Sequence, residues 1–174
     1  MYLLKCEDVY QSAFSEVLVS QFPNFIKKES KAYFAELYLS VIDKKLIISL
    51  DKKKIIVGVP IRLDDFLNYI IEAISDHSVK FDELLYCPYQ QKLHHGKKFF
   101  YLGNIHNIII QHLLLNLHDG VEKKFLYSLA WPNDKILMIN KFDTHLTNLK
   151  NLILEKLNFN ISFISKSGNI KLTY

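Results

Sequence analysis

The sequence contains few of the residues that catalysis or metal binding usually requires in close groups. It has one arginine, Arg62, and two cysteines, Cys6 and Cys87, which lie far apart without a CxxC motif or a nearby Cys/His ligand spacing. We interpret both cysteines as buried apolar residues in a reducing compartment. The sequence has no glycine-rich phosphate loop, no Ser/His/Asp or Cys/His set, and no histidines at metal-ligand spacing. We therefore expect a protein that is not an enzyme and uses no cofactor.

Glycine is also scarce, and long apolar runs are missing. The chain has 5 glycines in 174 residues, with 49% hydrophobic and 23% charged residues. This composition argues against disorder and leaves little room for a flexible linker. No window reaches the roughly 18 apolar residues that a membrane span needs, and the N-terminus lacks the pattern of a signal peptide. We expect a folded, cytoplasmic protein without a membrane partner.

Positive charge is concentrated in the second part of the chain. Residues 1–78 contain 10 Lys and Arg against 11 Asp and Glu, a net charge of −1, whereas residues 79–174 contain 12 Lys against 7 Asp and Glu, a net charge of +5. Six of the seven histidines, from His94 to His145, also lie in this second part. A basic surface of this kind favours an anionic partner.

Residues 1–78 predict a small α/β domain. An apolar run at residues 2–6 predicts a buried strand, Phe25 and Ile26 predict a second one, and apolar residues recur at helical spacing between them. Three β-rich runs separated by short Asp- and Lys-rich turns predict an antiparallel meander. The expected helices span 9–21 and 63–75, and the expected meander strands span 37–42, 46–50 and 55–59. The polar stretch 75–78 is the predicted domain boundary.

Residues 79–174 predict short strands, three helices and a terminal hairpin. The strands are expected at 81–89, 91–93 and 99–102 with a turn at 94–97, and the helices at 104–118, 122–131 and 140–157. In the second helix, Phe125, Leu126, Leu129 and Ala130 are expected to face inward, and Trp131 is expected in the core. The hairpin is expected at 161–174 around residues 166–168. The whole chain is therefore expected to be an α+β protein of two domains.

The helix expected at 140–157 has one apolar face and one polar face. Phe142, Leu146, Leu149 and Ile153 follow the i, i+4, i+7, i+11 spacing that keeps side chains on one side of a helix. Asn140, with an acidic residue three positions later, is a variant of the capping box and predicts that the helix starts there. The other side presents side chains that can reach phosphates or base edges. They are Lys141, Thr144, His145, Thr147, Asn148, Lys150 and Asn151.

Two motifs of the second part are typical of one DNA-binding fold. Residues 142–150 read Phe-Asp-Thr-His-Leu-Thr-Asn-Leu-Lys, and residues 126–131 read Leu-Tyr-Ser-Leu-Ala-Trp. They resemble the recognition-helix pattern and the end of the preceding helix in the winged helix-turn-helix of the OmpR/PhoB class of bacterial response regulators. The resemblance implies that residues 140–157 bind the major groove of double-stranded DNA, and that the hairpin is the wing at the minor groove. Lys166, Ser167 and Lys171 are then the expected wing contacts.

The first part resembles a receiver domain at its two ends. Residues 3–8 are similar to the first receiver strand and its acidic pair, which implies that Glu7 and Asp8 could hold Mg²⁺. Residues 59–67 are similar to the entry to the last receiver helix, with Val59 in place of the receiver lysine. Asp43 aligns with the phosphoacceptor, although a Lys-rich turn explains this residue equally well. The resemblance implies a shortened, degenerate receiver-like domain that forms a homodimer without phosphorylation.

Two functions remain open at this point. The first is an atypical response regulator that binds double-stranded DNA and regulates transcription. The alternative is a protein interaction module that kept the winged-helix fold and lost DNA binding, because Asn148 and Lys150 stand where the family usually has arginine. An uninterrupted positive surface over the third helix and the hairpin favours DNA binding, whereas an acidic or apolar patch there favours the alternative.

Overall fold

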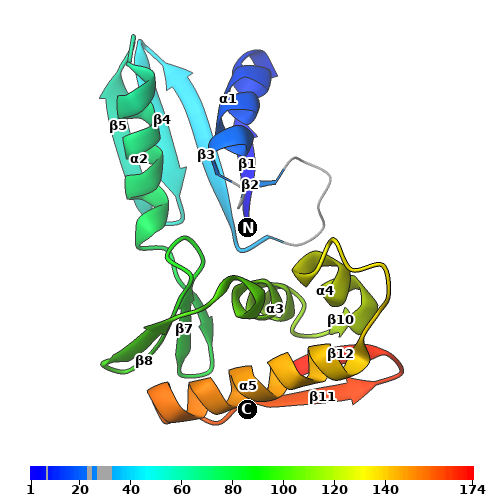
Figure 1. The fold of residues 1–174 in the computed structure, drawn as a ribbon. Helices are drawn as coiled ribbons and strands as arrows, with labels where there is room; N and C mark the ends of the chain where they lie inside the picture. The colour runs from blue at the N-terminus through cyan, green and yellow to red at the C-terminus, as the bar shows by residue number, and fades with distance from the viewer. Residues whose placement is uncertain (7, 23–24, 27–32) are drawn as a thin grey trace. The chain divides into compact units, whose positions relative to one another are not determined.

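The protein divides into two compact units of mixed α and β structure. The computed structural model describes residues 1–6, 8–22, 25–26 and 33–174, without the side chains of residues 8–11 and 25–26 (Figure 1). The first unit is Met1–His77 and the second is Ser78–Tyr174. The predicted boundary lies one residue later. Among the described residues, no helix combines the length and the apolar character that crossing a membrane requires.

The first unit is built on a five-stranded mixed sheet. Its elements are β1 (Tyr2–Cys6), α1 (Asp8–Gln21), β2 (Phe25–Ile26), β3 (Ala35–Ile42), β4 (Lys45–Leu50), β5 (Lys53–Gly58) and α2 (Leu63–Ser75). The strand order is β2-β1-β3-β4-β5, with β1 parallel to β2 and β3. Strands β3, β4 and β5 are antiparallel neighbours, which confirms the predicted meander.

Both helices of the first unit pack on the same face of this sheet. The rings of Phe14 in α1 and Phe66 in α2 stack with their centroids 5.3 Å apart. Leu37 and Leu39 of β3 are buried, because alternate residues of a strand point to the same side. Residues on the other side of the sheet stay exposed, including Tyr38 and Ile42. The sheet therefore has one covered face, and its other face is exposed along β3 and β5 but buried at Leu3 of β1.

The second unit combines an antiparallel sheet, three helices and a small sheet that contains the terminal hairpin. Its elements are β6 (Val79–Phe81), β7 (Leu84–Cys87), β8 (Lys92–His95), β9 (Lys98–Tyr101), α3 (Asn104–Leu115), β10 (Val121–Glu122), α4 (Lys123–Ala130), α5 (Ile139–Leu157), β11 (Ser162–Lys166) and β12 (Asn169–Thr173). The first four strands pair in sequence order, and the last three form a sheet in the order β10-β12-β11. The predicted order of sheet, three helices and hairpin is present.

Several predicted boundaries in the second unit are wrong. The strand expected at 81–89 is two strands, because Asp82 adopts a left-handed φ of 53° and reverses the chain. His94 and His95 lie in β8, and the turn is instead made at Gly96, with a φ of 57°. The helix expected to end at residue 118 ends at Leu115, and the short strand β10 has no counterpart in the prediction.

The buried side of α4 also differs from the prediction. Leu126 and Tyr127 are buried, whereas Phe125 is 46% exposed and Leu129 is 36% exposed. A helix of eight residues makes about two turns, so few of its side chains can reach the core. Trp131, expected in the core, is only half-buried at the end of this helix.

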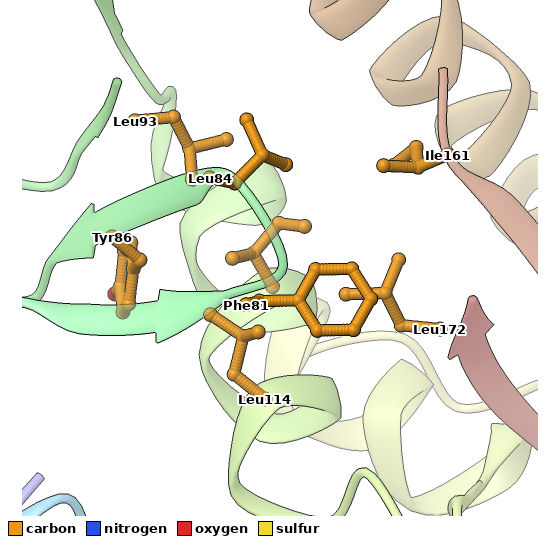
Figure 2. A pocket seen from close by; sticks show the side chains of 8 residues that line it. Phe81, Leu84, Tyr86, Leu93, Leu114, Ile161 and Leu172 are labelled. Atoms are coloured by element: carbon orange, nitrogen blue, oxygen red, sulfur yellow. The ribbon is translucent and has the colours of Figure 1, made fainter. Parts of the chain in front are cut away.

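Apolar side chains from the four-stranded sheet, helix α3 and the hairpin region close the core of the second unit. Phe81, Leu84, Tyr86 and Leu93 of the four-stranded sheet meet Ile110 and Leu114 of α3, and Ile161 and Leu172 of the hairpin region (Figure 2). The cavity between them has a volume of about 10 Å³. That is barely the space of one water molecule, and the apolar lining would not hold one. This interior is packing, not a ligand site.

Candidate nucleic-acid interface

Helix α5 is fixed to the second unit by its apolar face. Phe142, Leu146, Leu149 and Ile153 are all buried, together with Leu157 at the last position of the helix. This confirms the predicted apolar side. The outward side of the helix is thereby turned away from the core, which is the orientation that an interface requires.

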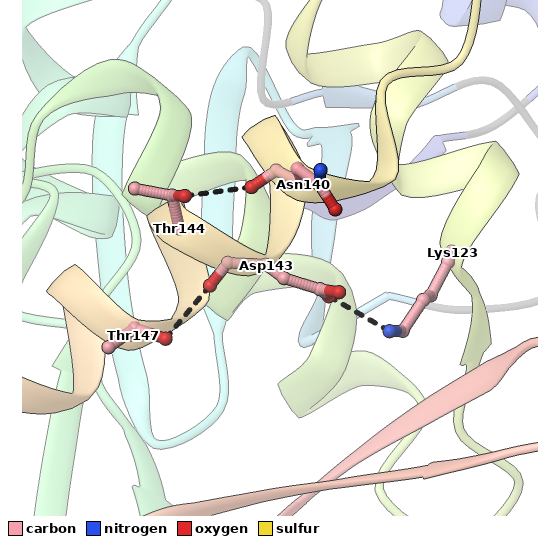
Figure 3. Close-up of polar contacts among 5 residues, drawn as sticks. All are labelled: Lys123, Asn140, Asp143, Thr144 and Thr147. Atoms are coloured by element: carbon pink, nitrogen blue, oxygen red, sulfur yellow. Dashed lines mark hydrogen bonds and ion pairs between the residues drawn. The ribbon is translucent and has the colours of Figure 1, made fainter.

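The predicted cap of α5 is wrong. The helix starts at Ile139, and its N-cap is Met138, which makes no side-chain capping bond. Asn140 therefore lies inside the first turn, where its carbonyl oxygen accepts a hydrogen bond from the Thr144 hydroxyl at 2.7 Å. Asp143 does not complete a capping box either, because its carboxylate pairs with the Lys123 ammonium at 2.9 Å (Figure 3).

The outward side of α5 carries uncharged polar side chains. Thr144, Thr147, Asn148 and Asn151 are exposed. The Thr147 hydroxyl donates to the carbonyl oxygen of Asp143 at 3.0 Å, so both threonines already use their donor within the helix (Figure 3). The amides of Asn148 and Asn151 have no hydrogen-bond partner among the described residues. These two asparagines can both donate and accept toward a ligand.

An open groove runs between α5 and strand β11. It is lined by Lys123, Asp143, Leu146, Thr147, Lys150, Asn151, Ser162, Phe163 and Ser165. Its wall on the helix side carries Lys150 and Asn151, and its wall on the hairpin side carries serine hydroxyls. The groove thus joins three predicted contact residues of α5 to the hairpin.

The hairpin is held beside α5 by its attachment to the start of α4. Strand β10 pairs with β12, and the amide of Lys123 donates to the carbonyl oxygen of Gly168 at 2.9 Å. Gly120 permits this approach: its φ is +75°, and a Cβ atom there would lie 2.6 Å from Cγ of Lys171. The groove therefore depends on a contact between segments some 50 residues apart in the sequence.

The predicted lysines divide into two groups. Lys150 lies in the groove and Lys166 is exposed at the end of β11, and neither has an acidic partner among the residues that the structure describes. Lys141 pairs with Asp134 at 2.8 Å, and its ammonium lies 4.7 Å from the centroid of the Trp131 ring. Lys171 is half-buried and its ammonium donates to the carbonyl oxygen of His118. Of the predicted contact lysines, Lys150 and Lys166 are thus the two with neither an acidic partner nor a hydrogen bond among the described residues.

Most carboxylates around α5 are neutralised by a lysine. Asp143 pairs with Lys123, and Glu155 pairs with Lys156 at 2.7 Å. Asp134 accepts from Lys141 and from the Tyr127 hydroxyl, and these bonds lower the pKa of Asp134, the lysine having the larger effect. Each of these ion pairs carries no net charge, so the positive field at the groove comes from lysines, such as Lys150, that have no acidic partner among the described residues.

His145 lies apart from the exposed contact residues. Its ring is half-buried, with its centroid 5.0 Å from the Trp131 ring and 5.6 Å from the His106 ring. The Nδ1 atom of His145 is buried and has no hydrogen-bond partner among the described residues. This histidine contributes to the packing of α5 against α3 and α4.

The C-terminal end of α5 is anchored by His95. The Nδ1 atom of His95 lies 3.0 Å from the Leu157 carbonyl oxygen, and its Nε2 atom lies 2.9 Å from the Glu83 carboxylate. Both partners are acceptors, so only the doubly protonated ring can donate to both. These two bonds, with that to Glu83 the stronger, raise the pKa of His95, although partial burial and, less strongly, nearby Lys98 oppose them.

We expect this anchor to make stability depend on pH. Because the folded pKa of His95 is raised, its contribution is complete below the unfolded pKa of about 6.5 and is lost as the pH rises through the folded pKa. His95→Gln should therefore reduce the urea midpoint more at pH 5.5 than at pH 8.5. The neighbouring His94→Gln is the matched control, because burial and Lys92 lower the pKa of His94. An equal loss at both pH values for His95→Gln would contradict this prediction.

Of the predicted site residues of the first unit, the structure describes the side chain of Asp43 alone. Asp43 and Lys44 form the exposed two-residue turn between β3 and β4, with φ values of 50° and 58°. Glu7 lies outside the described residues, and α1 begins at Asp8, whose side chain is also outside them. In the described part of the chain, no group of three or more His, Cys, Asp or Glu side chains is placed to hold a metal ion.

Sequence reasoning missed the residues that complete the groove. Ser162, Phe163 and Ser165 of β11 line its hairpin side, and Lys123 lines its end. Strand β11 reads Ser-Phe-Ile-Ser-Lys and does not alternate polar and apolar residues, so no local pattern marked the two serines. No local signal identifies Lys123, because its place depends on its ion pair with Asp143, which is 20 residues away.

Comparison with known proteins does not assign the chain. No family model matches it, and no curated protein does either.

Proposed function

We propose that this protein is a cytoplasmic, double-stranded DNA-binding regulator of transcription, neither an enzyme nor dependent on a cofactor. The second unit acts as a winged helix-turn-helix, with α5 as recognition helix and the β11–β12 hairpin as wing. The observation that supports this most is the groove between α5 and β11, where Lys150 and Asn151 face the hairpin across an open polar surface. A helix that projects from a unit of net charge +5 beside a hairpin suits a duplex.

The chemistry of the two walls suggests how contacts are divided. An α-helix fits the major groove, where an asparagine can form two hydrogen bonds to adenine. Asn148 and Asn151 have unused amides and take this role. Lys150 and Lys166 neutralise phosphates on either side of the groove, which contributes affinity without sequence preference. The Ser167 hydroxyl can donate to a phosphate oxygen. The hydroxyls of Thr144 and Thr147 already donate within α5, so these residues would have to release that bond to contact a phosphate.

The first unit, in this proposal, is a shortened receiver-like domain that mediates a homodimer without phosphorylation. A two-fold dimer would place two copies of α5 on neighbouring half-sites. Neither Asp43 nor the Glu7 and Asp8 pair is needed for this role, since dimerisation through residues 1–78 requires no phosphate switch.

The alternative, a protein interaction module, is favoured by one observation. The segment before α5 and the first residue of the helix expose large apolar side chains, with Ile136 76% exposed, Met138 56% and Ile139 55%. Apolar exposure of this extent is typical of protein contacts. An interaction module predicts binding to a protein partner and no affinity for duplex DNA.

Selection from a random duplex pool tests the proposed function. The full chain should enrich a defined sequence motif. Asn148→Ala should blur the preference at one or two positions, with each lost base contact worth about 1–3 kcal/mol, while total binding at low salt changes little. Asn160→Ala, an exposed asparagine beyond the end of α5, is the matched control. A pool that remains unenriched by the wild-type chain would favour the interaction module.

A further inference from the structure

The four-stranded sheet of the second unit exposes two aromatic rings on its outer face. Its inner face carries Leu93 of β8, which is buried in the core and pairs with Phe100 of β9. Because successive residues of a strand point to opposite sides, Phe99 and Tyr101 lie on the outer face. Phe99 is 54% exposed and Tyr101 is 63% exposed. Both rings are therefore open to a ligand from the same side of the sheet.

The strand register places a lysine between these rings. Lys92 of β8 pairs with Tyr101, and its ammonium lies 5.1 Å from the centroid of the Phe99 ring and 5.8 Å from that of the Tyr101 ring. The two rings meet edge to face, with their centroids 5.9 Å apart and their planes at 83°. The exposed fractions of both residues show that these contacts leave ring surface uncovered.

The strands of this sheet supply positive charge and no negative charge. They contain Lys80, Lys92 and Lys98 and neither aspartate nor glutamate. The Lys92 ammonium has no acidic partner among the described residues, and its contact with the rings leaves its charge in place. Lys80 is exposed on the same outer face, because the register aligns it with Phe99 in one row across the sheet. The outer face therefore attracts anions.

The nearest carboxylates in the sequence lie at the other end of the strands from Tyr101. Asp82 and Glu83 form the turn between β6 and β7, which is beside the start of β9, whereas Tyr101 is the last residue of β9. The Glu83 carboxylate is already 2.9 Å from Nε2 of His95. These two acids are therefore not placed to neutralise Lys92.

We propose that this outer face binds single-stranded nucleic acid, with unpaired bases stacked on Phe99 and Tyr101 and phosphates at Lys80 and Lys92. The ligand class follows from the combination of rings and charge. Every unpaired base has a flat face that stacks on an aromatic ring, and every nucleotide adds a negative charge. A four-stranded sheet can bind RNA by stacking two or three bases on its aromatic side chains. A face of this size suffices, because the ligand is a strand and not another folded surface.

This site is separate from the groove of the proposed function and does not depend on it. A duplex keeps its bases paired and stacked on one another, so it presents phosphates but no free base face to the rings. A protein segment would use the apolar area of the rings and not their π faces. Stacking therefore distinguishes a single strand from both of these ligands.

Fluorescence anisotropy with labelled single strands of oligo(dT) and oligo(U), added to the full chain at low salt, tests the site. The wild-type chain should bind at least one of them with a dissociation constant of roughly 1–100 µM. Phe99→Ala combined with Tyr101→Ala should weaken binding at least tenfold, because each stacked base contributes about fivefold or more. Phe125→Ala is the matched control, because Phe125 is 46% exposed on α4. It should change the affinity by less than twofold.

Two further substitutions at one position separate stacking from apolar contact. Tyr101→Phe keeps the ring and should bind as the wild type does, whereas Tyr101→Leu keeps apolar area without a ring and should bind as weakly as Tyr101→Ala. Lys92→Ala should reduce the magnitude of the salt slope by about 0.7, the value for one phosphate of a single strand. A preference for oligo(U) assigns RNA as the ligand, a preference for oligo(dT) assigns DNA, and equal affinity assigns both.

Three results would overturn this site. They are the absence of binding to either strand, full affinity of the variant that lacks both rings, and full affinity of Tyr101→Leu, which would indicate an apolar surface for a protein partner. Circular dichroism confirms that each variant is folded.

A cross-test separates this site from the groove. Lys150→Glu with Lys166→Glu should change single-strand binding by at most a few fold, and the variant without the two rings should bind duplex DNA as the wild type does. Single-strand binding that is lost with the two lysines and kept without the rings would place the strand in the groove and overturn this site. A chain that binds single strands through the rings but binds no duplex supports this site and rejects the proposed function.

Discussion

Phe142→Ala should destabilise the second unit by about 3–5 kcal/mol, the usual cost of removing a buried phenylalanine. Phe142 is 1% exposed on the core side of α5, and its ring centroid lies 6.4 Å from that of Trp131. The lost stability should include both the transfer free energy of the buried ring and the cost of the cavity that it leaves. Trp131 is the single tryptophan of the chain and lies in the second unit. Urea unfolding followed by its fluorescence therefore reports on this unit.

Phe125→Ala is the matched control for this prediction. It removes the same side chain from neighbouring helix α4, but Phe125 is 46% exposed, so the cost should stay near 1 kcal/mol or below. Equal losses for the two variants would show that the apolar face of α5 does not anchor the helix.

Reversing the charges of Lys150 and Lys166 should have the largest effect on DNA binding. Lys150→Glu combined with Lys166→Glu replaces two phosphate contacts by repulsion, and the expected loss is roughly 30- to 100-fold in affinity, or about 2–3 kcal/mol. Neither lysine has an acidic partner among the described residues, so the substitutions break no ion pair there. Stability should therefore change little. Fluorescence anisotropy with a labelled duplex measures the loss.

A double reversal elsewhere controls for net charge. Lys80→Glu with Lys97→Glu changes the charge of the second unit by the same amount at exposed positions of the four-stranded sheet. This double variant should lower the affinity for the duplex by at most a few fold, because long-range attraction is screened beyond about 10 Å at 0.1 M salt. If the two double variants lose affinity equally, binding follows net charge and the groove is not the contact site.

Much of the fold was predictable because its elements carry strong local patterns. The spacing of Phe142, Leu146, Leu149 and Ile153 placed the buried side of α5, and the runs between short polar turns placed the meander. The errors occur where one residue determines the path of the chain. Asp82 ends a strand by adopting a left-handed conformation, and the prediction had placed it together with Glu83 inside one longer strand. Strand β10 consists of two residues whose pairing depends on β12, more than 40 residues later.

The candidate site was less predictable, because its electrostatics depend on pairs between elements. Lys141 looked available from its place on the helix, but the structure pairs it with Asp134 and places it over Trp131. The sequence pattern placed His145 on the polar side of the helix, but in the structure its ring packs beside that of His106. Periodicity places a residue on a side of a helix, whereas the neighbouring helices decide whether that side is exposed. The contact surface is therefore narrower than the sequence suggested.

The salt dependence of duplex binding tests the central claim most directly. If α5 and the hairpin bind DNA through phosphates, the logarithm of the association constant should fall linearly with the logarithm of salt concentration, with a slope of about −0.9 per neutralised phosphate. Lys150→Ala should reduce the magnitude of that slope by about 1. Absent binding, or binding that does not change between about 50 and 200 mM salt, would contradict the account.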